Sequence, residues 1–379
     1  MRTRTMGFAA AALVGSAALL LAGCTTGGPA PAGTGGTAAG GPDVDAAQEF
    51  LAPWLSSGQK KLLIDEPLAA PIPDGLKIAY LDVGTPVAKN MWQILQDVVK
   101  ATGIQLDDIQ TGQDPQSIST GMNTVVEGGY DGVINITLDP QSFQTQLAEL
   151  KAKNVPIVSG SVMDTRENGM PEAFNGPDWM TSYGEGLAAA AVVRSEGKTS
   201  DFVLYTIPEF PFAQYQVTGF QDEMSKLCAG CNVRVVDIPI VDLGSTSTDD
   251  VVSDLQAHPE TGYAVMIGDE GTVGLKQKLD LAGIDVKWLG SWAIPPNLQQ
   301  VASGDQDATF PVDFNLMMWT VADQLFREIT KTSYEWPDAA TRATALQTLV
   351  TKDNASQYPG GYLAIPDYQT QFEKLWGIG

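Results

Sequence analysis

The chain has 379 residues, more than one hydrophobic core usually organises, so two domains or lobes are expected. Lys and Arg number 22 against 45 Asp and Glu, and the net charge of −23 excludes a nucleic-acid partner, because a phosphate backbone requires a basic face. The chain has one His, which removes most His-dependent catalysis and His-rich metal sites. We therefore expect no metal and no cofactor, and only carboxylate-based enzymes stay open.

The first residues predict export. Arg2 and Arg4 precede a charge-free apolar run over 8–22 that is too short to span a bilayer, which is typical of a secretory signal. The run ends in Leu-Leu-Ala-Gly-Cys24, which resembles the lipobox of bacterial lipoproteins. The resemblance implies a signal peptide over 1–23, a lipid on the Cys24 sulfur and a location outside the cytoplasm on the bacterial cell membrane. The alternative is an ordinary signal with an incidental Cys.

Two further segments precede the main body of the chain. Residues 24–42 consist almost entirely of Gly, Pro, Ala and Thr before the first acidic residue, a composition that predicts a flexible tether. Residues 43–75 form an N-terminal extension with a possible short helix over 46–55, for which the sequence gives no role. No later segment has the 18 consecutive apolar residues that a membrane span requires, so the lipid is the only predicted membrane contact.

Cys228 and Cys231 form a C-x-x-C motif between a predicted helix and a predicted strand. A redox role is disfavoured, because a reactive thiolate is usually stabilised at the start of a helix and not at its end. In an oxidising compartment the pair is expected to form a small structural disulfide.

From residue 77 onward, predicted strands and helices alternate. Short apolar runs predict strands at 77–81, 131–136, 155–158, 201–205, 233–238, 263–267 and 286–289. Helical periodicity predicts helices at 90–102, 141–153, 181–195, 214–227, 249–256 and 272–282, and a shorter one after Pro296. This order predicts an α/β fold with parallel sheets covered on both faces, in which ligands bind beyond the carboxyl ends of the strands.

Catalytic motifs for phosphate loops, nucleophile elbows and zinc proteases are missing from the sequence. His258 lies where a helix is expected to end, a place where His more often caps carbonyls. The acidic loop 242–250 lacks the spacing of an EF-hand and is interpreted as a helix-capping loop. The residues therefore favour binding over catalysis.

The order of the segments resembles the type I periplasmic binding proteins, in the ribose- and galactose-binding branch. The stretches that carry the resemblance are 77–81 with the loop at Pro86, 130–134, 153–158, 216–221, 268–274 with 281–283, and 348–354. The resemblance implies two Rossmann-like lobes joined by a three-strand hinge, with crossings near 176–178, 312–313 and 351–354. It assigns 76–177 plus 313–351 to lobe 1 and 178–312 plus 352–379 to lobe 2.

The resemblance also implies a function. A monomeric protein of this kind closes on a small molecule in the cleft and delivers it to the permease subunits of an ABC importer, as in sugar transport. One alternative is a sensor that presents its closed form to a membrane receptor. Another is an enzyme, for which adjacent Asp269 and Glu270 are poor candidates because their side chains point in different directions.

The positions that correspond to the family's ligand contacts define the expected site. They are Val87, Ala88, Lys89, Asp139, Ser161, Trp179, Gln214, Asp269, Trp292 and Asp313. Sugar-binding relatives carry aromatic residues and paired charges at several of these positions. Here Val87 and Ala88 replace the aromatics, and Ser161 with Val162 replaces an Asp-Arg pair. The departures favour a neutral ligand, sugar-like or flat and apolar, recognised by indoles and a few neutral hydrogen bonds, with a cationic ligand as the alternative.

Each strong candidate also has a structural alternative. Trp179 and Trp292 could pack the hinge or the lobes instead of a ligand. Asp269 could cap the helix predicted at 272–282, and Asp313 could hydrogen-bond the hinge backbone.

Overall fold

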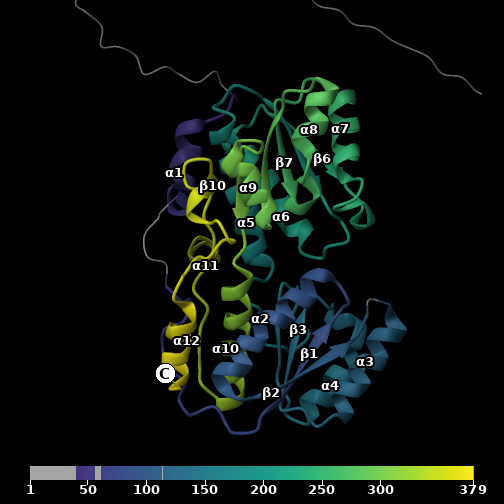
Figure 1. The fold of residues 1–379 in the computed structure, drawn as a ribbon, viewed down its shortest axis with the longest axis vertical. Helices are drawn as coiled ribbons and strands as arrows, with labels where there is room; N and C mark the ends of the chain where they lie inside the picture. Colours follow the sequence, from purple (N-terminus) through teal and green to yellow (C-terminus); the bar gives the residue numbers. More distant parts are fainter. Residues whose placement is uncertain (1–39, 56–60, 113, 379) are drawn as a thin grey trace, which may run out of the picture. The chain divides into compact units, whose positions relative to one another are not determined.

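The computed structural model describes residues 40–55, 61–112 and 114–378 (Figure 1). The predicted signal peptide, the lipidation residue Cys24 and the tether up to residue 39 lie outside the described residues. Within the described ranges, no helix is both long and apolar enough to cross a membrane.

The first lobe is built on a parallel four-stranded sheet. Its strand order is β2 (Gln105–Gln110), β1 (Lys77–Asp82), β3 (Gly132–Ile136), β4 (Ile157–Gly160). One face packs on α2 (Pro86–Thr102) and α10 (Phe314–Thr330), and the other on α3 (Pro115–Glu127) and α4 (Gln144–Ala152). The strands are therefore covered on both faces, as their continuous apolar runs predict.

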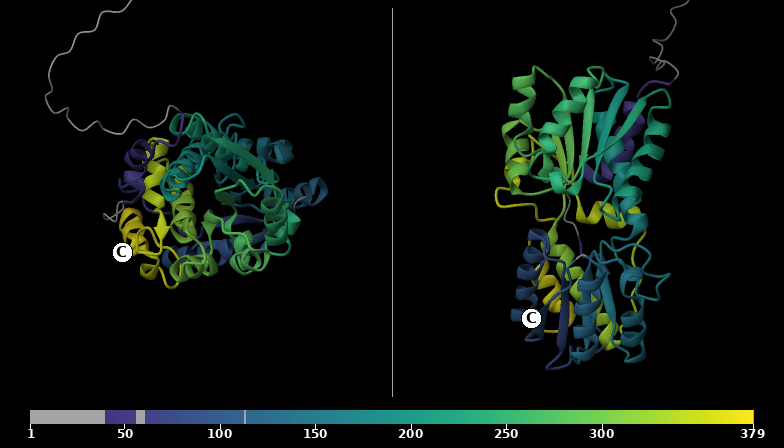
Figure 2. Two further views of the ribbon diagram at one scale, coloured as in Figure 1. Left: turned by 90° about the horizontal axis from the view of Figure 1, so that it is seen from above. Right: turned by 90° about the vertical axis from the view of Figure 1, so that its right-hand side faces the viewer.

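The second lobe is built on a six-stranded sheet. Its order is β10 (Val350–Thr351), β9 (Ala308–Pro311), β8 (Lys287–Ala293), β7 (Tyr263–Ile267), β5 (Asp201–Thr206), β6 (Asn232–Asp237), and only β10 runs antiparallel. The helices that pack on it are α1 (Val44–Leu55), α5 (Pro177–Arg194) and α6 (Ala213–Leu227) on one face and α7 (Ser247–Ala257) and α8 (Leu275–Ala282) on the other. Figure 2 shows helices on both sides of the strands. The predicted α/β fold is confirmed.

The helices α2 and α5 begin earlier than predicted, and each has a proline in its first turn. The helix expected at 90 begins at Pro86, where Thr85 Oγ1 accepts the Ala88 N–H at 3.1 Å. The helix expected at 181 begins at Pro177. Proline suits this position, since its missing N–H would have no helical partner there. As a result Val87, Ala88 and Lys89 lie on a helix and not in a loop.

The C-terminal part of the chain is divided between the two lobes differently from the prediction. Residues 352–379 were assigned to lobe 2, but α12 (Tyr368–Trp376) packs on the first lobe, where Trp376 stacks on Trp319 with ring centroids 5.2 Å apart. Conversely, α11 (Ala339–Leu346) and β10 pack on the second lobe, although 313–351 was assigned to lobe 1. The apolar face of α12 decides its location, because it completes a core that α10 leaves open.

The N-terminal extension contributes to both cores. In α1, Ala47 and Leu51 are fully buried in the second lobe, whereas Leu62 belongs to the core of the first. α9 (Pro295–Ser303) packs beside β10 at the edge of the second sheet.

Cys228 and Cys231 form a disulfide with their Cα atoms 5.3 Å apart. The loop they close holds the start of the described chain. The Gly230 N–H donates to the Gly40 carbonyl at 2.6 Å, and the Asp43 N–H donates to the Leu227 carbonyl at 2.7 Å. The disulfide therefore lies where the N-terminal segment joins the second lobe.

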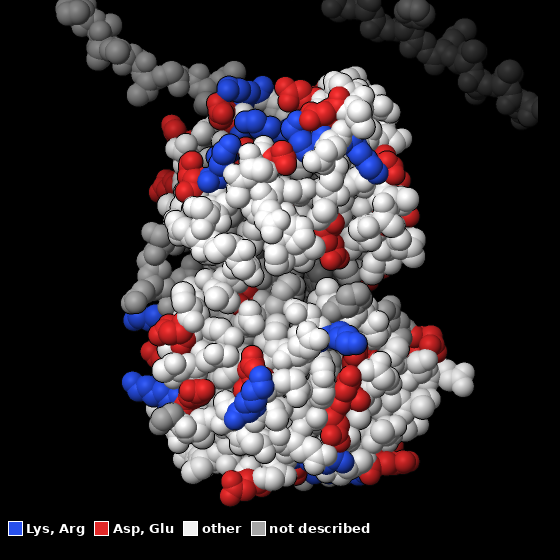
Figure 3. Space-filling view, in the orientation of Figure 1, with Lys and Arg blue, Asp and Glu red and all other residues white. Residues whose placement is uncertain are grey.

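Charged side chains of both signs are interspersed on the face drawn in Figure 3, and no continuous basic surface is visible there.

Candidate functional site

Aromatic side chains gather at the carboxyl ends of the strands in the second lobe. We call this group the aromatic cluster; it comprises Trp179, Tyr183, Phe210, Phe212, Trp292, Phe310 and Phe314. Its rings come from the first turns of α5, the segment after β5, the end of β8, the strand β9 and the start of α10. This is the edge at which parallel α/β sheets bind ligands.

Trp292 is at the centre of the aromatic cluster. Its ring centroid lies 5.2 Å from that of Phe212, 6.2 Å from Trp179 and 6.4 Å from Phe314. It is also partly exposed, whereas Trp179 is buried. Trp292 is therefore the indole that a ligand can reach first.

The backbone at this edge is strained. Trp292 has φ +63°, Ser161 after β4 has φ +55° and Thr137 after β3 has φ +82°. Bulky and β-branched residues rarely adopt these left-handed values, and such outliers concentrate at functional sites. Non-glycine residues with positive φ thus lie at the carboxyl ends of strands in both sheets.

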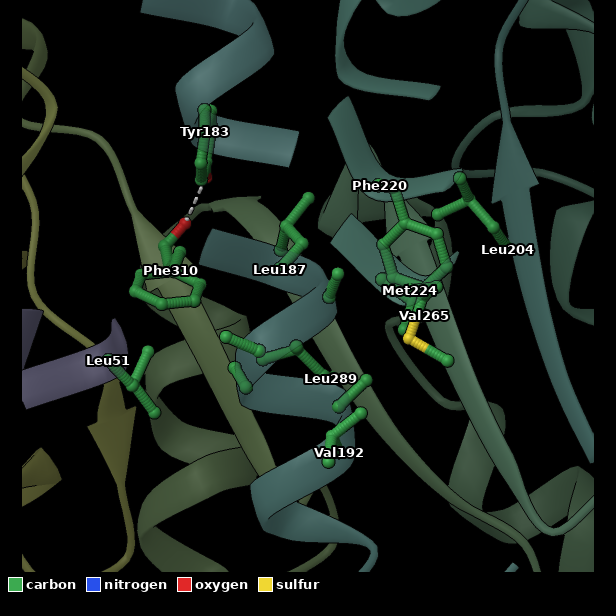
Figure 4. Packing of buried hydrophobic residues seen from close by; sticks show 14 of the residues in the cluster. Leu51, Tyr183, Leu187, Val192, Leu204, Phe220, Met224, Val265, Leu289 and Phe310 are labelled. Atoms are coloured by element: carbon green, nitrogen blue, oxygen red, sulfur yellow. Dashed lines mark hydrogen bonds between the residues drawn. The ribbon is translucent and has the colours of Figure 1, made fainter. Parts of the chain in front are cut away.

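Tyr183 holds Trp292 in its conformation. The Trp292 N–H donates to the Tyr183 hydroxyl oxygen at 3.3 Å, and that hydroxyl donates to the Phe310 carbonyl at 2.8 Å (Figure 4). Burial raises the pKa of Tyr183 far above its usual value, so the hydroxyl stays neutral and keeps donating.

Several polar groups near this edge have no partner among the described residues. The indole N–H groups of Trp179 and Trp292 are buried without an acceptor, and so are the Thr206 hydroxyl at the end of β5 and the Gln216 side-chain amide in α6. An unpaired buried donor costs about 1–3 kcal/mol. A ligand with oxygen or ring-nitrogen acceptors would recover part of that cost.

Asp269 is not placed to contact a ligand. Its carboxylate is fully buried and accepts hydrogen bonds from Thr272, Gln306 and Thr309 at 2.8–3.0 Å. It packs against Gly290, where a Cβ would come within 2.0 Å of it. Protein donors thus occupy both of its oxygens, and α8 begins only at Leu275, so Asp269 does not cap that helix.

Asp313 holds backbone at the start of α10. Its two carboxylate oxygens accept the N–H groups of Leu316 at 3.0 Å and Ala364 at 2.8 Å, and the side chain is buried. This arrangement corresponds to the alternative in which Asp313 hydrogen-bonds the hinge backbone. Burial raises the pKa of Asp313 to about 6.

The other predicted residues divide by location. Val87, Lys89, Asp139 and Gln214 are exposed. Asp139 Oδ1 accepts the Gln141 N–H at 2.8 Å as a helix cap, and the Gln214 amide donates to the Pro211 carbonyl at 3.1 Å.

Two predicted residues are buried in local hydrogen bonds. The carbonyl of Ala88 accepts the Tyr80 hydroxyl at 2.7 Å. The Asn175 side chain pairs with the Ser161 N–H and hydroxyl at 2.7 and 2.8 Å. Of the ten predicted ligand residues, only Trp179 and Trp292 meet in one cluster.

Sequence reasoning missed Tyr183, Phe212 and Phe314. Tyr183 lies one helical turn after Trp179, so its signal was present once the α5 start was placed correctly. Phe210-Pro-Phe212 lies in the short segment between β5 and α6. In the described residues, no group of three His, Cys, Asp or Glu side chains is arranged to hold a metal ion.

The buried Asp269 predicts a pH dependence of stability. Burial raises its pKa to about 6, above the value of an unfolded Asp, so the folded state binds the proton more tightly. Stability attributable to this residue is therefore gained as pH falls through 6 toward 4. Relative to D269N, the wild type is expected to gain about 2 kcal/mol between pH 7 and pH 4. Urea unfolding of both proteins across this range measures it, and parallel curves would contradict it.

Comparisons with known proteins agree with this architecture. A sequence model of the family described as the periplasmic binding protein domain matches residues 78–333. A search of curated protein sequences finds no match.

Solved structures of similar fold include three solute-binding proteins. An ABC transporter periplasmic solute-binding protein from Actinobacillus succinogenes with bound D-allose has 16% identity and TM-score 0.60, covering 75% of this chain and 100% of its own. One from Mycobacterium smegmatis with bound glycerol has 20% identity and TM-score 0.62, covering 76% and 98%. The Caulobacter myo-inositol binding protein has 18% identity and TM-score 0.61, covering 76% and 97%.

One assignment follows from three observations: the two α/β lobes, the aromatic cluster at the carboxyl ends of the strands, and the family match over 78–333. The chain belongs to the periplasmic binding protein domain family, in its type I form.

Proposed function

We propose that this protein is an extracytoplasmic solute-binding lipoprotein, anchored through Cys24, that captures a small neutral ligand and delivers it to an ABC importer. The ligand presents a flat or apolar face to the aromatic cluster and hydrogen-bond acceptors to the indole N–H groups. The observation that carries the proposal is Trp292, a partly exposed indole in a strained conformation among aromatic rings at the ligand-binding edge.

The charges of the site support a neutral ligand. Asp269 and Asp313 are buried, and their oxygens are taken up by protein donors. An anionic ligand would need a cation beside the aromatic cluster, and the predicted cation Lys89 is an exposed residue on α2 of the first lobe. Aromatic faces and a few neutral hydrogen bonds are the typical lining of small-molecule sites.

The named ligands of the similar structures set the starting compounds. D-allose, glycerol and myo-inositol are neutral polyhydroxylated molecules, and the proteins that bind them are named as transporter or binding proteins. Two of these proteins are named as solute-binding proteins of ABC transporters. We extend that role to this chain, with binding and not catalysis as its activity.

A thermal-shift panel on unfolded and refolded protein tests ligand class. The panel holds neutral sugars, polyols, nucleosides, aromatic compounds, amines and sugar phosphates. A ligand at 100 times its Kd stabilises the protein by about 2.7 kcal/mol, which gives a clear rise in Tm. Shifts limited to neutral compounds support the proposal. A shift with sugar phosphates alone would contradict it.

Truncating the central indole tests the site. W292A is expected to weaken binding of a panel hit by about 10- to 100-fold, because a buried aromatic anchor and its stacking are lost. W92A is the matched control, since Trp92 is also a partly buried indole but packs on Tyr80 in the first lobe. Isothermal titration gives both affinities, and equal losses in the two variants would place the ligand elsewhere.

A further inference from the structure

The helix α1 is anchored firmly, although it precedes the part of the chain that matches the family, 78–333. Its first turn is capped by Asp43, whose carboxylate accepts the Ala46 N–H at 3.1 Å. Ala47 and Leu51 on its inner face are fully buried against the second lobe. The helix is thus part of the core of the lobe that carries the aromatic cluster.

Trp54 at the end of α1 is fixed from three sides. Its carbonyl accepts the Thr348 hydroxyl at 2.9 Å and the Leu349 N–H at 3.2 Å. Its ring lies against Gly186 of α5, where an added Cβ would come within 2.9 Å of the indole. The ring is 97% buried, so it cannot reach a ligand itself.

The Trp54 ring supports the residue that holds Trp292. It stacks on Tyr183 at 6.4 Å with an interplanar angle of 21° and meets Phe310 edge-on at 5.1 Å. Tyr183 and Phe310 are the two residues joined by the hydrogen bond shown in Figure 4, and Leu51 of α1 belongs to the same buried cluster. Tyr183 also contacts Trp292, at 5.9 Å between centroids.

We infer that Trp54 is a positioning residue of the ligand site: through Tyr183 it keeps Trp292 in its left-handed backbone conformation, and α1 is therefore a working part of the site. A strained residue persists only where its surroundings over-determine it. Tyr183 contacts both Trp54 and Trp292, so removing Trp54 takes away one of the rings that keep Tyr183 in place. The role in binding rests on the proposed function, but the positioning of Trp292 does not.

Circular dichroism in the near ultraviolet tests the positioning without any ligand. The signal of Trp292 is obtained by subtracting the spectrum of W292F from that of the full-length wild type. The same subtraction is made in the W54L background, with W54L minus W54L/W292F. Because the signal depends on fixed ring geometry, we expect W54L to reduce it to about half or less. W54F, which keeps a ring against Tyr183, is expected to retain it.

The matched control is M224A, a cavity in the same core at a buried position on α6. It is expected to lower Tm by several degrees without changing the Trp292 signal. W54M replaces W54L if the latter does not fold. An unchanged signal in W54L or W54M, or an equal loss in M224A, would overturn the inference. The proposed function fails separately, if no neutral compound binds.

Discussion

G184A is expected to destabilise the second lobe by about 3 kcal/mol or more, at the upper end of the range for an overpacked core. Gly184 on α5 lies against the backbone of α6, where an added Cβ would come within 2.1 Å of the Gln216 carbonyl oxygen. Gly219 on α6 makes the reciprocal contact, at 2.1 Å from the Thr181 carbonyl oxygen. Backbone cannot rotate away as a side chain can, so the two helices must separate.

The separation also has a functional consequence. Trp179 and Tyr183 lie in the first two turns of α5, and Phe212 directly precedes α6, so the helix crossing sets the width of the aromatic cluster. Urea unfolding measures the stability loss, and G360A is the control because an added Cβ there meets nothing within 4 Å. A loss in G184A no larger than in G360A would show that the helices tolerate a wider spacing.

R327M is expected to cost about 3–5 kcal/mol, because it leaves a buried carboxylate without its counter-charge. The Arg327 guanidinium pairs with Asp323 at 2.7 Å, and both side chains are almost wholly inaccessible to solvent. Arg327 also donates to the Glu66 carbonyl at 2.7 Å, and the Trp376 indole donates to Asp323 at 2.8 Å. The pair therefore joins the N-terminal extension, α10 and α12.

The double variant D323L/R327M separates charge from packing. Replacing both members of a buried pair by apolar residues is often nearly neutral, so most of the loss is expected to be recovered. R327M alone should also regain stability as pH falls, because burial raises the pKa of Asp323 and the protonated form needs no partner. Guanidinium unfolding at two pH values measures both effects. A double variant as unstable as R327M would indicate that packing dominates.

The strands were predictable because their apolar runs are continuous; 263–267 was predicted with the observed bounds. The exceptions are β9, which was not predicted, and β2, whose sequence Gln-Leu-Asp-Asp-Ile-Gln is polar because it is an edge strand. Among the helices, α10, α11 and α12 were not predicted. α3 was also missed, since Ser, Thr and Gly lower its helical propensity, although Asp114-Pro115 is a helix-start signal.

The site was harder to predict than the fold. The resemblance supplied positions, but it could not show that Asp269 turns inward to Gln306, a residue far along the chain. Nor could it place Trp54, because the contact with Tyr183 joins residues of segments that no local pattern connects. Trp179 and Trp292 were included in the expected site because they occupy positions that correspond to the family's ligand contacts, and the structure brings these two indoles together.

The position of the disulfide loop determines how the molecule bears a mechanical load. The described chain begins at Gly40, whose carbonyl accepts the Gly230 N–H between Cys228 and Cys231, and Asp43 then donates to the Leu227 carbonyl. A pull on Gly40 therefore acts first on the second lobe, at a loop that the disulfide closes. The load next reaches α1, whose inner face is buried in the same lobe.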